Sequence, residues 1–102
     1  MVYILLATGF EEIEAIAPCD LLRRAGIPAA FVGVSGKTVA GSHGIPVTAD
    51  LTLGELDLTA LDMIVLPGGL EGVKNLAASR EAISIRIIRA MPENTTVHSS
   101  AY

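Results

Sequence analysis

The sequence predicts an α/β fold in which helices cover both faces of a mostly parallel sheet. Continuous apolar runs rich in β-formers recur at residues 2–7, 29–34 and 62–67, and such runs are typical of strands buried on both faces. A segment whose apolar residues have helical spacing, 11–26, separates the first two runs. Parallel strands require crossover connections of this kind. The 102 residues suffice for one small core and not for two, so we expect a single domain spanning residues 1–102.

The first helix is predicted over residues 11–26. Its acidic residues come first and two arginines come last, an order that complements the helix dipole, and a glycine ends it. The apolar residues near helical spacing are Ile13, Ile16, Leu21 and Leu22. After the second strand, residues 35–50 are expected to form short β segments with turns, in which Pro46 suits an edge strand.

The second half of the chain continues the alternation. Residues 52–58 predict one or two helical turns, and the strand at 62–67 ends in Pro-Gly-Gly. Two helices are then expected, a short one at 70–78 and a longer one at 79–91. Residues 95–100 predict a last, weak strand. Because ligands of parallel sheets bind beyond the carboxyl ends of the strands, we look for function in the segments that follow them.

The composition argues against several classes of protein. Seven Lys and Arg against eleven Asp and Glu give a net charge of −4 without a basic run, so no nucleic-acid surface is expected. No apolar stretch is long enough to span a membrane, and the first strand lacks the flank and cleavage site of a signal peptide. The only cysteine, Cys19, cannot form an internal disulfide, which suits the cytoplasm. Two histidines and one cysteine far apart give no metal-ligand spacing, so we expect neither metal nor cofactor.

Three acids, Glu11, Glu12 and Glu14, open the predicted helix. Acids there offset the positive helix N-terminus by a few tenths to about 1 kcal/mol each, and Glu11 and Glu12 need no other explanation. Glu14 differs because Pro18 follows four residues later. Proline has no N–H to give to the carbonyl of residue 14 and crowds it, at about 3 kcal/mol in an ordinary helix. Glu14 is therefore a candidate functional acid, although perturbed acids are often structural.

The Pro-Gly-Gly sequence at residues 67–69 is the second candidate. Glycines there allow positive φ and close approach of the backbone to a ligand, and the amides of Gly68 and Gly69 would suit an oxyanion or phosphate. The simpler explanation is a tight strand-to-helix turn. Neither the P-loop nor the dinucleotide-binding glycine pattern is present.

The remaining candidates carry weaker signals. His43 lies at the tip of a predicted turn at residues 41–44, where a lone histidine is usually just solvated. Cys19 is expected in the core or at an interface. His98 lies in the last predicted strand, where a packed structural role is favoured over a catalytic one.

Three sequence motifs follow one another along the chain: "ATGFEEIEAIAPCDLLRRAGI", "VGVSGKTVAGSHGIPVTAD" and "DMIVLPGG". With them, the sequence closely resembles the N-terminal half of the ThiJ/PfpI family, which includes the parkinsonism-associated protein deglycase and bacterial relatives. The resemblance covers residues 1 to about 91. It implies a flavodoxin-like three-layer sandwich, truncated at its C-terminal side and usually dimeric. It also implies glyoxalase- or deglycase-type cysteine hydrolases that act on aldehyde or carbonyl adducts in the stress response.

The resemblance assigns expected roles to individual residues. The family holds its reactive cysteine with a carboxylic acid from the first helix, and that acid matches Glu14. The family's oxyanion-hole amides match Gly68 and Gly69. Its two anion-binding arginines match Arg24, which would reach across a dimer, and His43, where a histidine weakens the anion pocket at neutral pH.

The position of the family's nucleophile departs from the pattern. Ser100 falls nearest to the cysteine position, with Ser99 as the alternative, and the elbow helix that follows it in the family is not in this sequence. A serine hydroxyl is a weak nucleophile without an adjacent base, so we expect little or no activity toward small carbonyl compounds from this chain alone. Uncovered apolar sheet surface would favour a homodimer, or pairing with a chain that supplies the missing half.

Two other functions stay open. A non-catalytic binding or interaction domain would keep the fold and Glu14 without a nucleophile. A phosphate-binding flavodoxin-type module would need a hydroxyl-rich loop after the first strand, and residues 7–12 are too acidic for it.

Overall fold

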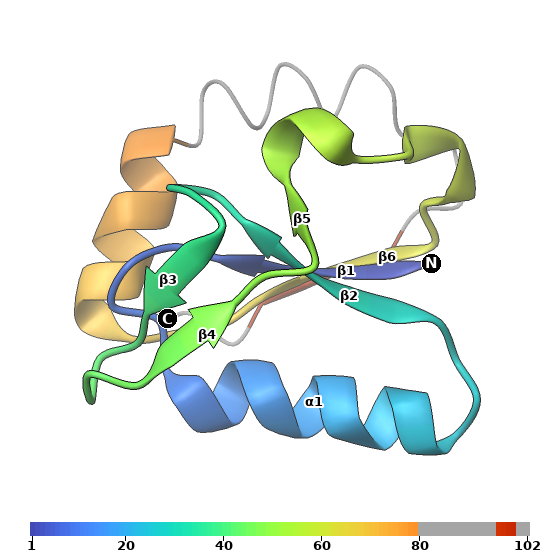
Figure 1. The fold of residues 1–102 in the computed structure, drawn as a ribbon, viewed down its shortest axis with the longest axis horizontal. Coiled ribbons are helices and arrows are strands. Elements are labelled where there is room, and N and C mark those ends of the chain that lie inside the picture. The colour runs from blue at the N-terminus through green and yellow to red at the C-terminus, as the bar shows by residue number, and fades with distance from the viewer. Residues whose placement is uncertain (80–95, 100–102) are drawn as a thin grey trace.

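A parallel sheet forms the centre of the computed structural model, which describes residues 1–79 and 96–99 (Figure 1). Within these residues the strand order is β5-β2-β1-β6-β7, and every neighbouring pair is parallel. The register places Ile4 between Phe31 and Val65. The strands are β1 (Val2–Leu6), β2 (Ala29–Gly33), β5 (Leu51–Thr52), β6 (Met63–Leu66) and β7 (Thr96–Ser99). The predicted α/β class with a mostly parallel sheet is confirmed.

The helix α1 (Glu12–Arg24) connects β1 to β2 and has the charge order that its sequence predicts, with acids in the first turn and arginines in the last. Its end is a glycine-based cap. Gly26 has a φ of 75°, its N–H donates to the carbonyl of Arg23 at 3.1 Å, and the N–H of Ile27 donates to the carbonyl of Leu22 at 2.9 Å. These two bonds satisfy carbonyls that the helix leaves free.

Short elements fill the segment between β2 and β6. The strands β3 (Thr38–Ala40) and β4 (Pro46–Thr48) form a separate antiparallel hairpin, which confirms short β segments with Pro46 at an edge. Two 3-10 helices follow, η1 (Leu53–Glu55) and η2 (Leu58–Ala60). The helical turn expected at 52–58 is confirmed by η1, whereas η2 lies mostly beyond the predicted segment.

The strand β5, which directly precedes η1, is not predicted by the sequence pattern. It has two residues, paired with Val32 and Gly33, and a strand this short has no periodicity to detect.

Alternate side chains of the sheet enter two cores. On one face the buried side chains pack with α1 and the hairpin, and they include Val2, Ile4, Leu6, Cys19 and Val39. On the other face Tyr3, Leu5, Val32 and Ile64 pack with Leu53, Leu58 and Leu76. Figure 1 shows α1 on one side of the sheet and the 3-10 segment on the opposite side. The expected core position of Cys19 is confirmed.

The helical predictions differ in outcome. The apolar residues of α1 do not all face the sheet, since Ile13 is 74% exposed and Leu21 is 65% exposed. The short helix expected at 70–78 is confirmed over residues 70–79, and the strand expected at 95–100 is confirmed as β7. The helix expected at 79–91 lies outside the described residues from position 80 onward. None of the described helices has the length and apolar character needed to cross a bilayer.

The sheet reverses its winding direction between β1 and β6. The chain passes from β1 to β2 on one side, whereas β6 and β7 lie on the other side of β1. Open α/β sheets bind ligands at the carboxyl ends of the strands where such a reversal occurs. The segments that follow β1 and β6, residues 7–12 and 67–69, therefore mark the place to search for a site.

Candidate functional site

The turn after β6 packs directly against the start of α1. The N–H of Glu11 donates to the carbonyl oxygen of Gly68 at 2.9 Å. The N–H of Gly72 donates to the carbonyl oxygen of Gly9 at 3.1 Å. Gly69 has a φ of 103°, and a Cβ atom on it would lie 2.6 Å from the oxygen of Gly9 and 3.0 Å from the nitrogen of Glu11. Both the backbone conformation and the lack of space require glycine at residue 69.

The amides of this turn are unused within the described residues. Neither the N–H of Gly68 nor that of Gly69 donates a hydrogen bond to an acceptor there, although Gly68 is buried and Gly69 half-buried. Buried amides are nearly always paired, so an acceptor is expected for the N–H of Gly68, and the described part of the chain does not supply one. The two amides could accept a negatively charged or polarised oxygen as a ligand.

Glu14 lies in the first turn of α1, one turn after Glu11. Its side chain is half-buried and makes no hydrogen bond or ion pair with the described residues. Pro18 lies inside α1, so the carbonyl of Glu14 has no helical N–H to accept. Glu14 and the turn at 67–69 thus belong to segments that are joined at Glu11 and Gly68.

The end of β7 is next to the same turn. Ser99 is paired with Leu66, the last residue of β6, so the chain leaves β7 beside residues 67–69. Ser100 lies outside the described residues. The backbone therefore brings the ends of β1, β6 and β7 to neighbouring places, and the roles of Glu14, Gly68, Gly69 and Ser100 stay predictions.

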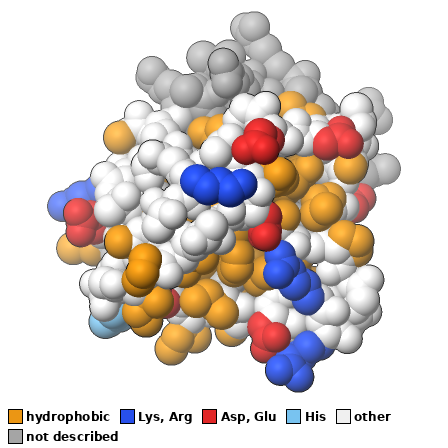
Figure 2. Space-filling view, in the orientation of Figure 1, with side chains coloured by type: hydrophobic (Ala, Val, Ile, Leu, Met, Phe, Trp, Pro, Cys, Tyr) orange, Lys and Arg blue, Asp and Glu red, His pale blue; other side chains and the backbone are white. Residues whose placement is uncertain are grey.

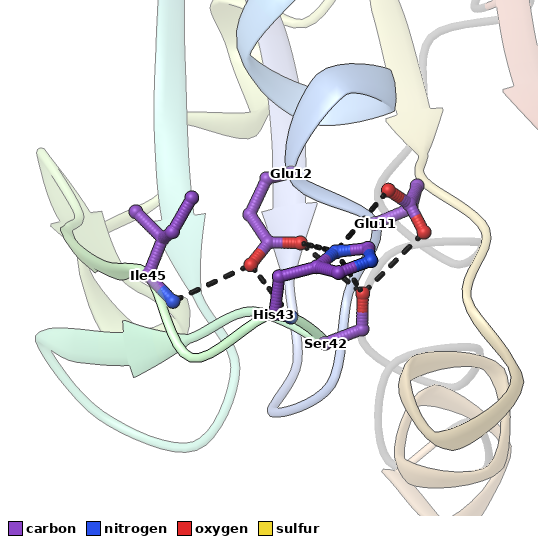
Figure 3. Close-up of polar contacts among 5 residues, drawn as sticks. All are labelled: Glu11, Glu12, Ser42, His43 and Ile45. Atoms are coloured by element: carbon purple, nitrogen blue, oxygen red, sulfur yellow. Dashed lines mark hydrogen bonds and ion pairs between the residues drawn. The ribbon is translucent and has the colours of Figure 1, made fainter.

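A second cluster joins α1 to the hairpin, and Figure 3 shows its side chains converging. The Oε1 atom of Glu12 accepts from the hydroxyl of Ser42 at 3.1 Å and lies 2.9 Å from Nδ1 of His43. The Oε2 atom accepts from the backbone N–H of His43 at 2.8 Å and from that of Ile45 at 3.4 Å. Glu11 adds a weaker contact, because its Oε1 lies 3.6 Å from the same Nδ1.

This cluster explains how a carboxylate can be buried. Glu12 is only 4% exposed. Burial raises the pKa of Glu12, but the hydrogen bonds from the side chain and backbone of His43 and from the backbone of Ile45 outweigh it and lower the pKa from 4.5 to about 2. The hydrogen bond to Glu12, together with the charges of Glu11 and Glu12, raises the pKa of His43 above 6.5.

The hairpin turn is shaped around this carboxylate. Gly41 has no room for a Cβ atom, which would overlap the carboxylate of Glu12. Gly44 has a φ of 75° and donates its N–H to the carbonyl of Gly41 at 3.0 Å, which closes the turn. The glycines therefore let the backbone N–H groups of His43 and Ile45 point at one buried side chain.

Two expectations from the sequence are wrong here. Glu12 is not an ordinary charge at a helix start, because it is buried and caps the hairpin turn. His43 is not simply solvated, because its ring contacts Glu12 although its side chain is 68% exposed. The partners lie 31 residues apart in the sequence. No local pattern reports a contact of that range, and only the glycines around His43 hinted at a shaped turn.

The two predicted anion-binding residues are not brought together within this chain. His43 lies at the first turn of α1, whereas Arg24 is in its last turn and its Nε is 3.1 Å from both carboxylate oxygens of Asp20. The 13 residues of α1 span about 20 Å. An anion pocket that uses both residues would need a second copy of the chain.

The geometry of the cluster argues against two chemical roles. Among the described residues, the His, Cys, Asp and Glu side chains that come close enough for a metal are Glu11, Glu12 and His43, with ligand atoms within 4.8 Å of one another. Both oxygens of Glu12 are already occupied by hydrogen bonds, so we assign no metal site. Ser42 also lies 3.1 Å from Nδ1 of His43, but Glu12 contacts the same nitrogen. A catalytic triad needs the acid and the nucleophile on different ring nitrogens.

Sequence comparison matches residues 1–98 to the model of the DJ-1/PfpI family. Protein DJ-1 homolog B of Arabidopsis thaliana is 39% identical over 82 residues, which are 78% of this chain and 18% of that protein. The Parkinson disease protein 7 homolog of Danio rerio is 38% identical over 78 residues, 74% of this chain and 41% of that protein. A deglycase of Thermococcus kodakarensis is 37% identical over 68 residues, 67% of this chain and 41% of that protein.

Solved structures give the same result. A mutant of a DJ-1 superfamily protein from Salmonella typhimurium has a TM-score of 0.81 and 40% identity, over 96% of this chain and 53% of that one. Drosophila melanogaster DJ-1beta has a TM-score of 0.82 and 30% identity, again over 96% and 53%. The chain thus spans about half the length of these structures. The resemblance that the sequence motifs indicated is confirmed, and the chain belongs to the DJ-1/PfpI family.

Proposed function

We propose that the carboxyl edge of the sheet, with Glu14 and the turn at 67–69, forms a site for small aldehyde or carbonyl compounds of the kind that glyoxalases and deglycases process. The observation that carries this proposal is the pair of amides of Gly68 and Gly69, which find no acceptor among the described residues, at the reversal point of the sheet. A deglycase is among the relatives of the chain, which supports this substrate class.

Each part of the site would have a distinct task. The amides of Gly68 and Gly69 would hold the carbonyl oxygen as it gains negative charge. Glu14 would hold or move a proton at the attacking group, since its side chain has no other partner among the described residues. The attack on the carbonyl carbon would come from the residue that follows β7.

The nucleophile limits the activity that we propose. Cys19 lies on the buried side of α1, and this burial raises the pKa of its thiol, so it is a poor source of thiolate. By the resemblance, Ser100 is nearest to the family's cysteine position, with Ser99 as the alternative, and a serine hydroxyl needs an adjacent base. We therefore propose that this chain binds carbonyl compounds with little or no turnover, in the cytoplasm and without a cofactor.

The competing proposal is a non-catalytic interaction domain with no carbonyl site. Methylglyoxal consumption and binding separate the two. We expect consumption close to that of a protein-free blank, together with methylglyoxal-dependent shifts of the Gly68 and Gly69 amide signals in an NMR titration. Turnover comparable with a full-length cysteine enzyme of the family would contradict the limit on activity. Unchanged amide signals would favour the interaction domain.

We also propose a homodimer that forms through α1. Ile13, Ala17 and Leu21 are exposed and spaced by four residues, so they share one side of the helix. Ile45 of the hairpin is exposed as well. Figure 2 shows hydrophobic side chains gathered on the surface near the hairpin and α1. Apolar groups gathered in this way commonly mark an association surface. A second copy of the chain could also bring its Arg24 toward His43, the other residue predicted to bind an anion. Pairing with a different chain that carries the rest of the family's fold is the competing outcome.

A further inference from the structure

The β3–β4 hairpin is held to the body of the protein by a small number of contacts near α1. The N–H of Gly9 donates to the carbonyl of Ala40 at 2.9 Å, and the N–H of Ser42 donates to that of Phe10 at 2.8 Å. The side chain of Glu12 contacts the turn that joins the two strands, and the side chain of Glu11 adds weaker contacts to Ser42 and His43. The hairpin pairs with no strand of the main sheet within the described residues, but Val39 of β3 is buried in the core. The polar contacts therefore mainly decide how firmly the turn between β3 and β4 is held to α1.

His43 is the one ionisable side chain between positions 38 and 48. The charged groups that face its ring come from the start of α1, namely the carboxylates of Glu12 at 2.9 Å and Glu11 at 3.6 Å. The hydroxyl of Ser42 is its other polar neighbour. No positively charged side chain among the described residues pairs with either carboxylate, so a proton on His43 supplies the only positive charge in the cluster.

The protonation state of this ring therefore changes the contact. Protonated His43 donates from Nδ1 to a carboxylate and gains attraction to two negative charges. Neutral His43 can keep a hydrogen bond in one tautomer only, and the charge attraction is lost. Since Glu12 is buried, loss of that positive charge leaves its negative charge less compensated.

We propose that His43 is a proton-sensitive latch that fastens the β3–β4 hairpin to the first turn of α1 when it is protonated and loosens the hairpin when it is neutral. The inference stands on the contacts of this cluster and does not depend on the proposed carbonyl site.

The direction of the pH effect follows from linkage. The folded pKa of His43 lies above 6.5, so the stabilisation from the latch is complete below pH 6.5 and is lost as the pH rises through the raised pKa. The folded pKa of Glu12 is lowered to about 2, so its stabilisation is complete above pH 4.5 and is lost as the pH falls toward that value. The latch is therefore tightest between pH 4.5 and pH 6.5, the ordinary pKa values of glutamate and histidine.

Hydrogen exchange measured by NMR tests the latch at single amides. The reporters are the N–H groups of Ser42, His43 and Ile45, over a range from about pH 5 to about pH 9 that brackets histidine titration. After correction for the intrinsic pH dependence of exchange, we expect their protection to fall as His43 loses its proton. Each unit by which the folded pKa exceeds the unfolded one corresponds to about tenfold in preference for the latched form. Protection that stays flat across the titration would overturn the proposal.

Two variants assign the effect to one residue. In His43→Gln the pH dependence of protection should disappear, because glutamine keeps a donor and does not titrate. In His98→Gln, which removes the other histidine of the chain, it should persist. Equal pH dependence in His43→Gln would overturn the latch. Should His43→Gln not fold, the ring titration of His43 in Glu12→Gln decides, and the proposal requires its pKa to fall relative to the unchanged chain.

Discussion

The backbone N–H of Glu11 donates a hydrogen bond of 2.9 Å to the carbonyl oxygen of Gly68, and this bond ties the start of α1 to the turn after β6. The same residue, Glu11, reaches the hairpin through its side chain. One short segment thus connects the proposed carbonyl site with the hairpin latch.

The close contact at Gly69 predicts a sensitive position. Gly69→Ala places a methyl group against the oxygen of Gly9 in a backbone conformation with a φ of 103°, so the free energy of unfolding should fall by more than about 1 kcal/mol. Urea denaturation of the variant and the unchanged chain measures the difference. Gly54→Ala is the matched control, because nothing lies within 4 Å of a Cβ there. Equal stability of the two variants would show that the turn is not packed as described.

The hairpin turn predicts a coupling between two residues. Gly41→Ala should destabilise the chain because the new methyl group overlaps the carboxylate of Glu12. In a Glu12→Ala background the same substitution should cost less, since the clash is gone. A double-mutant cycle from denaturation data gives the interaction energy, which should be about 0.5–3 kcal/mol for residues in contact. Additive effects would argue against the burial of Glu12 under this turn.

The two-faced core predicts a contrast between two leucines. Leu5 is 1% exposed in the centre of the sheet, whereas Leu70 is 80% exposed. Leu5→Ala should lower the free energy of unfolding by about 2–5 kcal/mol through lost burial and a new cavity. Leu70→Ala should change it by less than about 0.5 kcal/mol. Thermal or urea unfolding of both variants measures the contrast, and equal stability losses would contradict the burial of Leu5 and the exposure of Leu70.

The proposed dimer predicts that charge on α1 weakens self-association. Leu21→Lys should raise the dissociation constant by about tenfold or more, since burying a leucine side chain contributes about 1.5–3 kcal/mol. Sedimentation equilibrium measures this constant. The control is Leu70→Lys, an exposed leucine outside α1 that should leave it unchanged. If the unsubstituted chain is a monomer at all concentrations measured, the homodimer is ruled out.

Much of the fold could be predicted because its signals are local. The buried strands are continuous apolar runs, α1 has its acids, arginines and terminal glycine in order, and the turn at 67–69 has its glycines where the backbone needs them. β5 was not predicted because a strand of two residues is too short to show an alternating pattern of apolar residues. The exposure of Ile13 and Leu21 was not predicted because helical spacing alone does not show which apolar residues of the helix face the sheet.

The candidate site was only partly predictable for a similar reason. Glu14 stood out because Pro18 lies four residues away, and Gly68 and Gly69 stood out as a pair. Glu12 looked no different from its acidic neighbours, since its burial depends on a turn some 30 residues further along the chain. Arg24 and His43 matched two anion-binding positions, but a helix of 13 residues keeps them apart within one chain.

The most direct test of the proposed site restores a thiol at the position that follows β7. The variant is Ser100→Cys in a Cys19→Ala background, so that residue 100 carries the only thiol. The account predicts a gain of methylglyoxal consumption, because a thiol is a far better nucleophile than the serine hydroxyl. Glu14→Gln should reduce that gain by about a hundredfold or more, whereas Glu11→Gln should leave most of it. Methylglyoxal consumption that stays unchanged, or a gain that is independent of Glu14, would contradict the account.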